Sequence, residues 1–193
     1  SWAKLFNLLG LPVAELNGMS QQLLAARQAV ALGANNPAAG LNAPLLPQMT
    51  SQLGWLGLSP ATVTALKPYV TVLPERTPLN VNTASAESLF ATIPTLDMAT
   101  AQQFVRQRAN RPPVDDMAAI QKALGNVAGE NGLSFATKYF EIRGRLRLDD
   151  LAQEEVMLVE RNGPQVKSLW RYRSTQSLGN IESDARLLQS AKP

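Results

Sequence analysis

The spacing of the apolar residues changes once along this chain, near residue 136, and that change limits the folds it can adopt. Before it, apolar residues recur every three or four positions between frequent prolines, which indicates short amphipathic helices. After it, apolar and charged residues alternate, as in a strand with one buried and one wet face. The pattern predicts an α+β fold: a largely helical domain over residues 1–135, antiparallel strands over 136–173 and a polar tail over 174–193.

The alternation is clearest in residues 139–148, where four apolar side chains and Gly144 take the even positions and all the charged ones take odd positions. Residues 156–160 and residues 165–173, the latter with Val166, Trp170 and Tyr172 on one side, are predicted as two more strands. Asn162-Gly163 lies between them and predicts a tight type I′ turn, which needs positive φ at both central positions. We therefore expect an antiparallel meander of three strands. Its apolar face needs a cover, and we expect either a preceding helix or a face of the helical part to supply it.

Residues 79–108 form the best-defined helical segment. Asn82 or Thr83 is expected to cap a first helix, because both side chains can accept hydrogen bonds from free amides at a helix start. Pro94 ends that helix, and Asp97 is expected to cap a second one. The segment therefore predicts a compact helical hairpin.

Further short helices and loops are expected on both sides of this hairpin. The predicted helical pieces are residues 2–9, residues 12–33 with an apolar stripe reaching Val30, residues 52–58, a helix opened by Ser59-Pro60 and a helix opened by Asp115 or Asp116. The predicted irregular pieces are the loops over 34–48 and 126–134 and an extended piece over 69–73.

The composition excludes several function classes. The chain has no Cys and no His, which removes disulfides, thiol nucleophiles, His-based triads and Cys or His metal sites. A net charge of +3 is too small to indicate nucleic-acid binding. No apolar run is long enough to cross a membrane. Because the chain begins at Ser1 rather than Met, we expect a preceding segment to carry an anchor or a targeting signal.

Three pairs of adjacent acidic residues are candidates for acid–base chemistry: Asp115-Asp116, Asp149-Asp150 and Glu154-Glu155. Neighbouring side chains diverge, so we interpret the pairs as a helix start, a turn and a solvated strand start. The sequence shows no dense acidic loop for calcium and no glycine-rich phosphate loop after a strand. We predict no catalytic, cofactor-binding or metal-binding residue, and no enzyme. A hydrolase that uses only carboxylates distant in sequence is the remaining enzymatic alternative.

Two groups of arginines need a separate interpretation: Arg143, Arg145 and Arg147 on the first strand, and Arg106, Arg108 and Arg111 after the hairpin. Arginine stripes can contact phosphate. They also occur on solvated strand faces, where glutamates on neighbouring strands balance them. We favour the second interpretation, because Trp170 and Tyr172 are expected to share a buried face with Val166 and so provide no stacking platform for bases.

The segment Leu79-Asn80-Val81-Asn82-Thr83-Ala84, the leucine-led helix after it, Pro94 and a second helix ending in Gln107-Arg108 together resemble two families. Ile93-Pro94 and Tyr139-Phe140-Glu141-Ile142 continue the pattern of the first family named below. One is the K-type minor pseudopilin of the bacterial type II secretion system. The other is the helix-hairpin-helix DNA-binding module of competence DNA receptors and repair proteins. The hairpin turn, Pro94 to Asp97, contains no glycine for close approach to phosphate and places a carboxylate there. DNA binding is therefore kept only as the alternative.

The resemblance to K-type pseudopilins covers about residues 50 to 173. It implies a helical domain with helix-hairpin-helix-like units, inserted in a pilin-like α/β fold whose last strands follow. It implies a non-catalytic protein at the tip of the pseudopilus that takes part in protein export. Its implied partners are the I- and J-type minor pseudopilins and other pseudopilus subunits, not nucleic acid. This part would lie in the periplasm, held to the inner membrane by a missing N-terminal helix. Family members bind calcium through an acidic loop, where this sequence has Asn, Pro and Ala.

Overall fold

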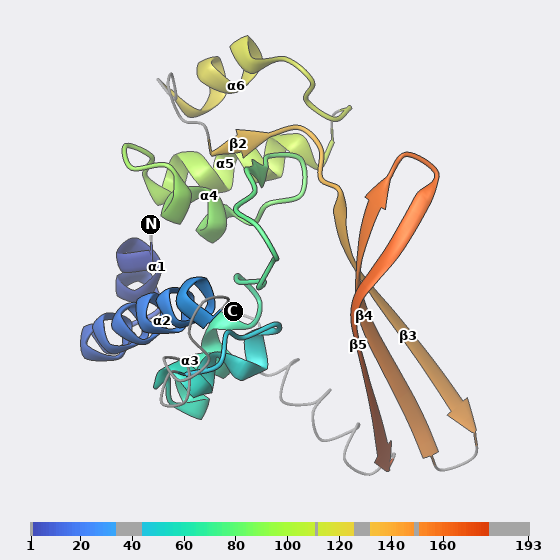
Figure 1. Ribbon diagram of the computed structural model, residues 1–193. Helices are drawn as coiled ribbons and strands as arrows, with labels where there is room; N and C mark the ends of the chain where they lie inside the picture. Colours follow the sequence, from blue (N-terminus) through green and yellow to red (C-terminus); the bar gives the residue numbers. More distant parts are fainter. Residues whose placement is uncertain (1, 34–43, 111, 126–131, 149–150, 178–193) are drawn as a thin grey trace. The chain divides into compact units, whose positions relative to one another are not determined.

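The computed structural model describes residues 2–33, 44–110, 112–125, 132–148 and 151–177 (Figure 1). The chain forms two compact units, Ser1–Ala136 and Thr137–Pro193. In the described residues the first unit is mainly helical and the second is an antiparallel sheet. This mixture of helices and antiparallel sheet confirms the α+β class.

The first unit is built from short helices. They are α1 (Trp2–Leu8), α2 (Val13–Gly33), the 3₁₀ helix η2 (Thr50–Leu56), α3 (Pro60–Leu66), α4 (Ala86–Thr92), α5 (Met98–Arg108) and α6 (Met117–Leu124). Two short strands, β1 (Leu79–Asn80) and β2 (Leu133–Ser134), pair in parallel. The prediction of loop at β2 was wrong, because a strand of two residues is too short to show a period. The extended piece expected over 69–73 forms no described strand.

Most helix starts lie where the sequence places them. Ser59, Asp97 and Asp116 cap α3, α5 and α6, and each side chain accepts from a backbone amide one turn into its helix. The cap predicted for α4 was wrong: it is Ser85, whose hydroxyl accepts from Ser88 N at 3.1 Å. The asparagines before it have other hydrogen-bond partners.

Unit 1 contains two apolar clusters. The first, around α4, α5 and α6, is made mainly by Val81, Leu89, Ile93, Phe104, Ile120, Leu124 and Leu133. The second, among α1, α2, η2 and α3, is made mainly by Phe6, Leu16, Met19, Leu53, Leu56 and Leu66. Helix α4 contributes to both, since Leu89 belongs to the first cluster and Ala91 to the second. The hairpin is thus packed on both sides.

The second half of α2 departs from the prediction. The apolar stripe was expected to be buried as far as Val30, but Val30 is 63% exposed and Leu24 and Leu32 are similarly open in the described structure. Burial along this helix stops at Ala26. Helical spacing identifies a face but does not say where its packing partner ends.

Unit 2 confirms the predicted meander. Its strands β3 (Tyr139–Leu148), β4 (Leu151–Asn162) and β5 (Gln165–Ser177) lie in the order β3-β4-β5 with antiparallel pairing (Figure 1). Strand β3 matches its predicted bounds, whereas β4 and β5 are longer than predicted. The expected polar tail is therefore wrong over 174–177, which are strand. Its remainder, residues 178–193, lies outside the described residues.

The turn between β4 and β5 differs from the predicted type. Asn162 pairs with Gln165, so the two central residues are Gly163 and Pro164 rather than Asn162 and Gly163. Gly163 has a φ of 59°, but the ring of proline holds φ near −65°. A type I′ turn is thereby excluded, and the pattern suits a type II′ turn, which needs glycine only at its first central position.

A bulge in β5 overturns the predicted shared face of Val166, Trp170 and Tyr172. Val166 pairs with Arg161, whereas Trp170 pairs with Leu158, and the register shifts between Leu158 and Val159. Paired residues lie on the same face of a sheet, and residues three apart on β4 lie on opposite faces. Val166 therefore lies on the face opposite to the two aromatic side chains.

Candidate functional site

The segment Leu79–Ala84, here called the asparagine turn, is organised by one side chain. Asn82 Oδ1 accepts from Val114 N at 2.8 Å, and its Nδ2 donates to Val114 O at 2.8 Å and to Phe135 O at 3.1 Å. Both amide protons and the oxygen of Asn82 are thus used. One side chain joins the turn to the segment before α6 and to the segment after β2.

Further hydrogen bonds complete the asparagine turn. Asn80 Oδ1 accepts from Asn82 N at 2.9 Å, so each asparagine has a defined partner. From α5, the Arg108 guanidinium donates to Val81 O and to Ala84 O. Burial lowers the pKa of Arg108 below its ordinary value. Phosphate contact was the less favoured interpretation of this arginine, and its guanidinium instead joins α5 to the turn.

The turn between α4 and α5 is closed by a lysine distant in sequence. Lys4 Nζ donates to Ile93 O at 2.9 Å, to Pro94 O at 3.2 Å and to Leu96 O at 3.1 Å. The same ammonium lies 3.9 Å from the ring centroid of Phe90. An ammonium has three donors, and all three are used. The cation holds the carbonyl groups of the turn against α1.

The same turn carries an anion. Asp97 Oδ1 accepts from Thr100 N at 2.9 Å and Oδ2 accepts from Thr100 Oγ1 at 2.7 Å. These two bonds lower the pKa of the exposed Asp97 carboxyl, so it stays ionised at neutral pH. A phosphate approaching this turn would meet a carboxylate and no glycine. The geometry therefore opposes the DNA-binding alternative.

The acidic pairs do not form a catalytic group among the described residues. Asp116 caps α6 while Asp115 is exposed, and Glu154 forms an ion pair with Arg145 at 3.5 Å. The pair at positions 149 and 150 lies outside the described residues. In the described ranges no cluster of three or more His, Cys, Asp or Glu side chains could hold a metal ion.

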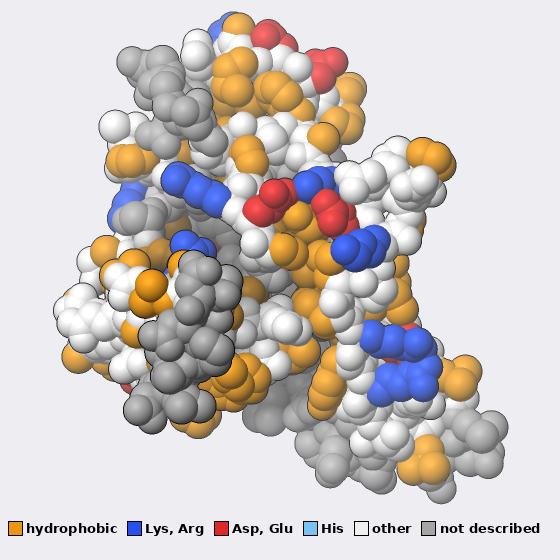
Figure 2. All heavy atoms as spheres, viewed as in Figure 1, with side chains coloured by type: hydrophobic (Ala, Val, Ile, Leu, Met, Phe, Trp, Pro, Cys, Tyr) orange, Lys and Arg blue, Asp and Glu red, His pale blue; other side chains and the backbone are white. Residues whose placement is uncertain are grey.

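The strand arginines have acidic neighbours. Arg143 contacts Glu141 at 2.6 Å on its own strand. On β5, Arg171 and Arg173 contact Glu155 at 2.6 and 2.5 Å, and together they lower the pKa of the Glu155 carboxyl. Figure 2 shows basic groups beside acidic ones on the face in view. These contacts agree with a solvated, charge-balanced surface. Arg106 is exposed, and the arginine at position 111 lies outside the described residues.

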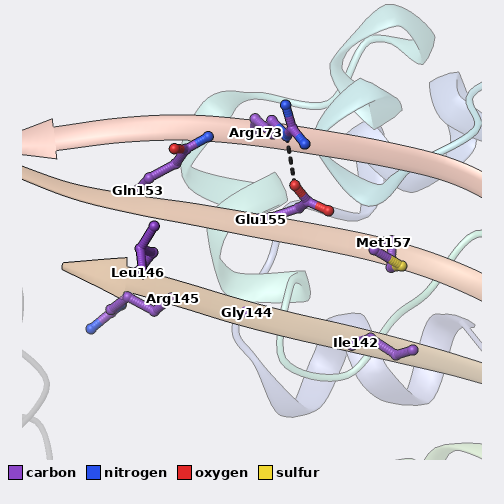
Figure 3. A pocket seen from close by; sticks show the side chains of 8 residues that line it. All are labelled: Ile142, Gly144, Arg145, Leu146, Gln153, Glu155, Met157 and Arg173. Carbon is purple, nitrogen blue, oxygen red and sulfur yellow. Dashed lines mark hydrogen bonds and ion pairs between the residues drawn. The ribbon is translucent and has the colours of Figure 1, made fainter. Parts of the chain in front are cut away.

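Two open hollows bring no pair of carboxylates together. One, of about 200 Å³, is lined by residues of α1 and α4 together with Tyr69, Val70 and Leu79, and has no acidic residue in its lining. The other, of about 410 Å³ on the sheet, has Glu155 as its acidic residue (Figure 3). No described helix has the length and apolar character needed to cross a membrane.

These features describe an α+β protein in which Asn82, Arg108 and Lys4 make contacts within the helical unit. Residues 79–142 match the family described as type II secretion system (T2SS), protein K. A curated relative, type II secretion system protein K of Pseudomonas aeruginosa, is 35% identical over 113 residues, which are 58% of this chain and 34% of that relative. The matched region thus spans about a third of the relative's length. The resemblance to K-type minor pseudopilins is confirmed by both comparisons.

The family match begins at the asparagine turn and includes the whole helical hairpin. Two of the residues that organise this region were missed by sequence reasoning. Ser85 precedes an Ala-Glu-Ser-Leu run and could have been recognised as a cap from that position. Lys4 carries no comparable signal, because its three acceptors lie about ninety residues away.

We predict that Asn82→Asp destabilises unit 1 by about 2–3 kcal/mol, because a carboxylate would face two carbonyl oxygens that now accept from the amide. Urea unfolding followed by the helical circular dichroism signal measures the loss. Asn110→Asp, at an exposed position, adds the same charge and should change stability by less than about 0.5 kcal/mol. Equal effects of the two substitutions would refute the role assigned to Asn82.

Lys4→Met should leave the three carbonyl groups of the turn without their donor and cost about 1–2 kcal/mol. The local effect is faster amide hydrogen exchange between Ile93 and Asp97. Lys67→Met, on an exposed side chain, is the matched control and should leave that exchange unchanged. Unaltered exchange in Lys4→Met would show that the turn closes without the ammonium.

The Asp97 cap predicts a defined dependence on pH. The folded pKa lies below the ordinary value of 3.8, so the carboxylate stabilises the protein fully above that pH. Its contribution is lost as the pH falls through the lowered folded pKa. The stability difference between the native protein and Asp97→Asn should therefore shrink below pH 3.8, as measured by urea unfolding at a series of pH values. Asp115→Asn controls for net charge, and a difference that stays constant with pH would contradict the assignment.

Proposed function

We propose that this chain is part of a K-type minor pseudopilin that takes part in type II protein secretion as a non-catalytic component. The observation that carries the proposal is the family match over residues 79–142, which contain the asparagine turn, the helical hairpin and the start of the sheet. The internal use of Asn82, Arg108 and Lys4 fits a scaffold that presents a surface to other subunits. Protein K of Pseudomonas aeruginosa is named as a component of the same secretion system.

In this proposal the protein lies at the tip of the pseudopilus with the I- and J-type minor pseudopilins, and the helical unit prevents a further subunit from adding above it. The described part would lie in the periplasm, with the protein held to the inner membrane by a preceding helix. That helix would pack on the sheet of unit 2 in a pilin-like fold. The proposal includes no cofactor, since the sequence has no acidic loop of the kind calcium needs.

The DNA-binding alternative has no support from the family match or the curated relative, both of which concern protein secretion. The Asp97 carboxylate and the absence of glycine in the hairpin turn also oppose it. We therefore do not propose nucleic acid as a partner.

The test combines the purified protein with the soluble domains of its cognate I- and J-type partners at about 20–50 μM, a range that detects complexes with micromolar Kd. Size-exclusion chromatography with light scattering should show one species with the summed mass of three chains. Each pairwise mixture controls for the contribution of each partner.

A parallel titration with fluorescent duplex DNA at low salt should show no binding over the same concentration range, whereas binding driven by phosphate would appear and weaken as salt rises. Salt-sensitive DNA binding without a protein complex would overturn the proposal and restore the alternative. Absence of both signals would also reject the tip complex for this part of the protein.

A further inference from the structure

An asparagine followed directly by a glycine occurs at residues 17–18, 131–132 and 162–163. In such a pair the backbone nitrogen of the glycine can attack the side-chain carbonyl carbon of the asparagine, because glycine has no Cβ to hinder the approach. The backbone around each pair decides whether the two atoms can meet. The first and third pairs are described in full, whereas Asn131 lies outside the described residues.

The pair at 162–163 lies in the turn between β4 and β5. Asn162 pairs with Gln165, so the hydrogen-bonded ladder ends there and the Gly163 nitrogen lies beyond it (Figure 1). The side-chain bond at this glycine comes from Arg161 Nε at 3.2 Å and engages its carbonyl oxygen, not its nitrogen. Residues 161–165 are all exposed in the described structure. Neither the ladder nor this bond therefore holds the Gly163 nitrogen away from the Asn162 side chain.

The pair at 17–18 is held in a helix. Asn17 and Gly18 lie within α2, Val13–Gly33. Inside an α-helix each N–H group points along the axis to the carbonyl group four residues earlier, while the side chains project outward. The Gly18 nitrogen can therefore reach the Asn17 side chain only if the helix opens. Asn17 is exposed, as Asn162 is, so the two sites differ in backbone rather than in access to water.

We propose that Asn162 is a site of spontaneous deamidation in the folded protein, which converts it to aspartate and isoaspartate. The Gly163 nitrogen loses its proton and forms a bond to Asn162 Cγ. The Cγ–Nδ2 bond breaks, and Nδ2 takes up that proton and leaves as ammonia. The intermediate is a cyclic imide, which water opens at either of its two carbonyl carbons. Opening at Cγ gives aspartate, and opening at the main-chain carbonyl carbon gives isoaspartate.

The two products change the turn differently. Aspartate keeps the main chain and lowers the net charge of the protein from +3 to +2. In isoaspartate the main chain runs through Cβ and Cγ, which lengthens it by one atom at the residue that closes the turn. A two-residue turn depends on the pairing of the residues on either side of it, here Asn162 and Gln165. We therefore expect isoaspartate to loosen the adjoining ends of β4 and β5. The inference goes beyond the proposed function and holds whether or not the tip complex forms.

The test incubates the full 193-residue protein at mildly alkaline pH and follows each site by peptide mass spectrometry. Loss of the amide adds about 1 Da to a peptide. Trypsin releases the three pairs in separate peptides, because Arg27 and Lys138 lie between them. In the folded protein Asn162 should lose its amide at least about tenfold faster than Asn17, since α2 must open locally before Asn17 can react. Chromatography should separate an isoaspartate form and an aspartate form of the Asn162 peptide.

Two comparisons separate the effect of the fold from that of the sequence. In concentrated urea the rates at Asn17 and Asn162 should agree within about threefold, because both are then the same dipeptide in an unfolded chain. Gly163→Ala should slow the reaction at Asn162 about tenfold or more, in the folded protein and in urea alike, because a methyl group then hinders the nitrogen. Gly18→Ala is the matched control and should leave the rate at Asn162 unchanged.

Three results would overturn the proposal. The first is an equal rate of amide loss at Asn17 and Asn162 in the folded protein. The second is no loss at Asn162 in the folded protein under conditions in which the sample in urea reacts. The third is loss at Asn162 that gives aspartate without isoaspartate, which would indicate direct hydrolysis by water and no attack by the Gly163 nitrogen.

Discussion

The part of unit 1 around the α4–α5 hairpin depends on the hydrogen bonds of the Asn82 side chain. It bonds to Val114 and Phe135, which lie 32 and 53 residues further along the chain. Buried side chains pack against the segments it joins, including Val81 at 0% and Leu133 at 8% exposure. An amide suits this position because it donates and accepts at once, whereas a carboxylate or a hydroxyl supplies only part of that set. The α4–α5 hairpin is packed against this fixed frame.

Three charged side chains of unit 1 form hydrogen bonds that join its segments. Lys4 closes the hairpin turn, Arg108 ties α5 to the asparagine turn, and Glu15 accepts from Ser59 N at 3.0 Å at the start of α3. The bond from Ser59 N is the largest cause that lowers the pKa of Glu15, so this contact joins α2 to α3 at neutral pH. Groups held in this way are poor ligands for phosphate. These contacts therefore tie the hairpin to the rest of unit 1.

Unit 2 is organised differently, because neither face of its sheet is uniformly apolar. The face of Phe140 and Ile142 also carries Glu155 with its two arginines, while the face of Arg143 and Arg145 also carries the buried Leu158. The family match ends at Ile142, in the first half of β3. The rest of β3 and all of β4 and β5 lie beyond the residues that the family model matches.

The sequence alone determined the features that depend on neighbouring residues. Side chains cap α3, α5 and α6 because Ser59, Asp97 and Asp116 can bond to amides one turn away, and alternation located β3 because strand side chains alternate over a few residues. Tertiary structure decided what depends on distant segments: the Asn82 contacts, the partner carbonyls of Lys4, the pairing of β2 and the bulge that separates Val166 from Trp170. It also decided the turn at Gly163, since strand register selects which two residues are central. Local signals act over a few residues, whereas register and long-range hydrogen bonds are fixed only when the segments pack together.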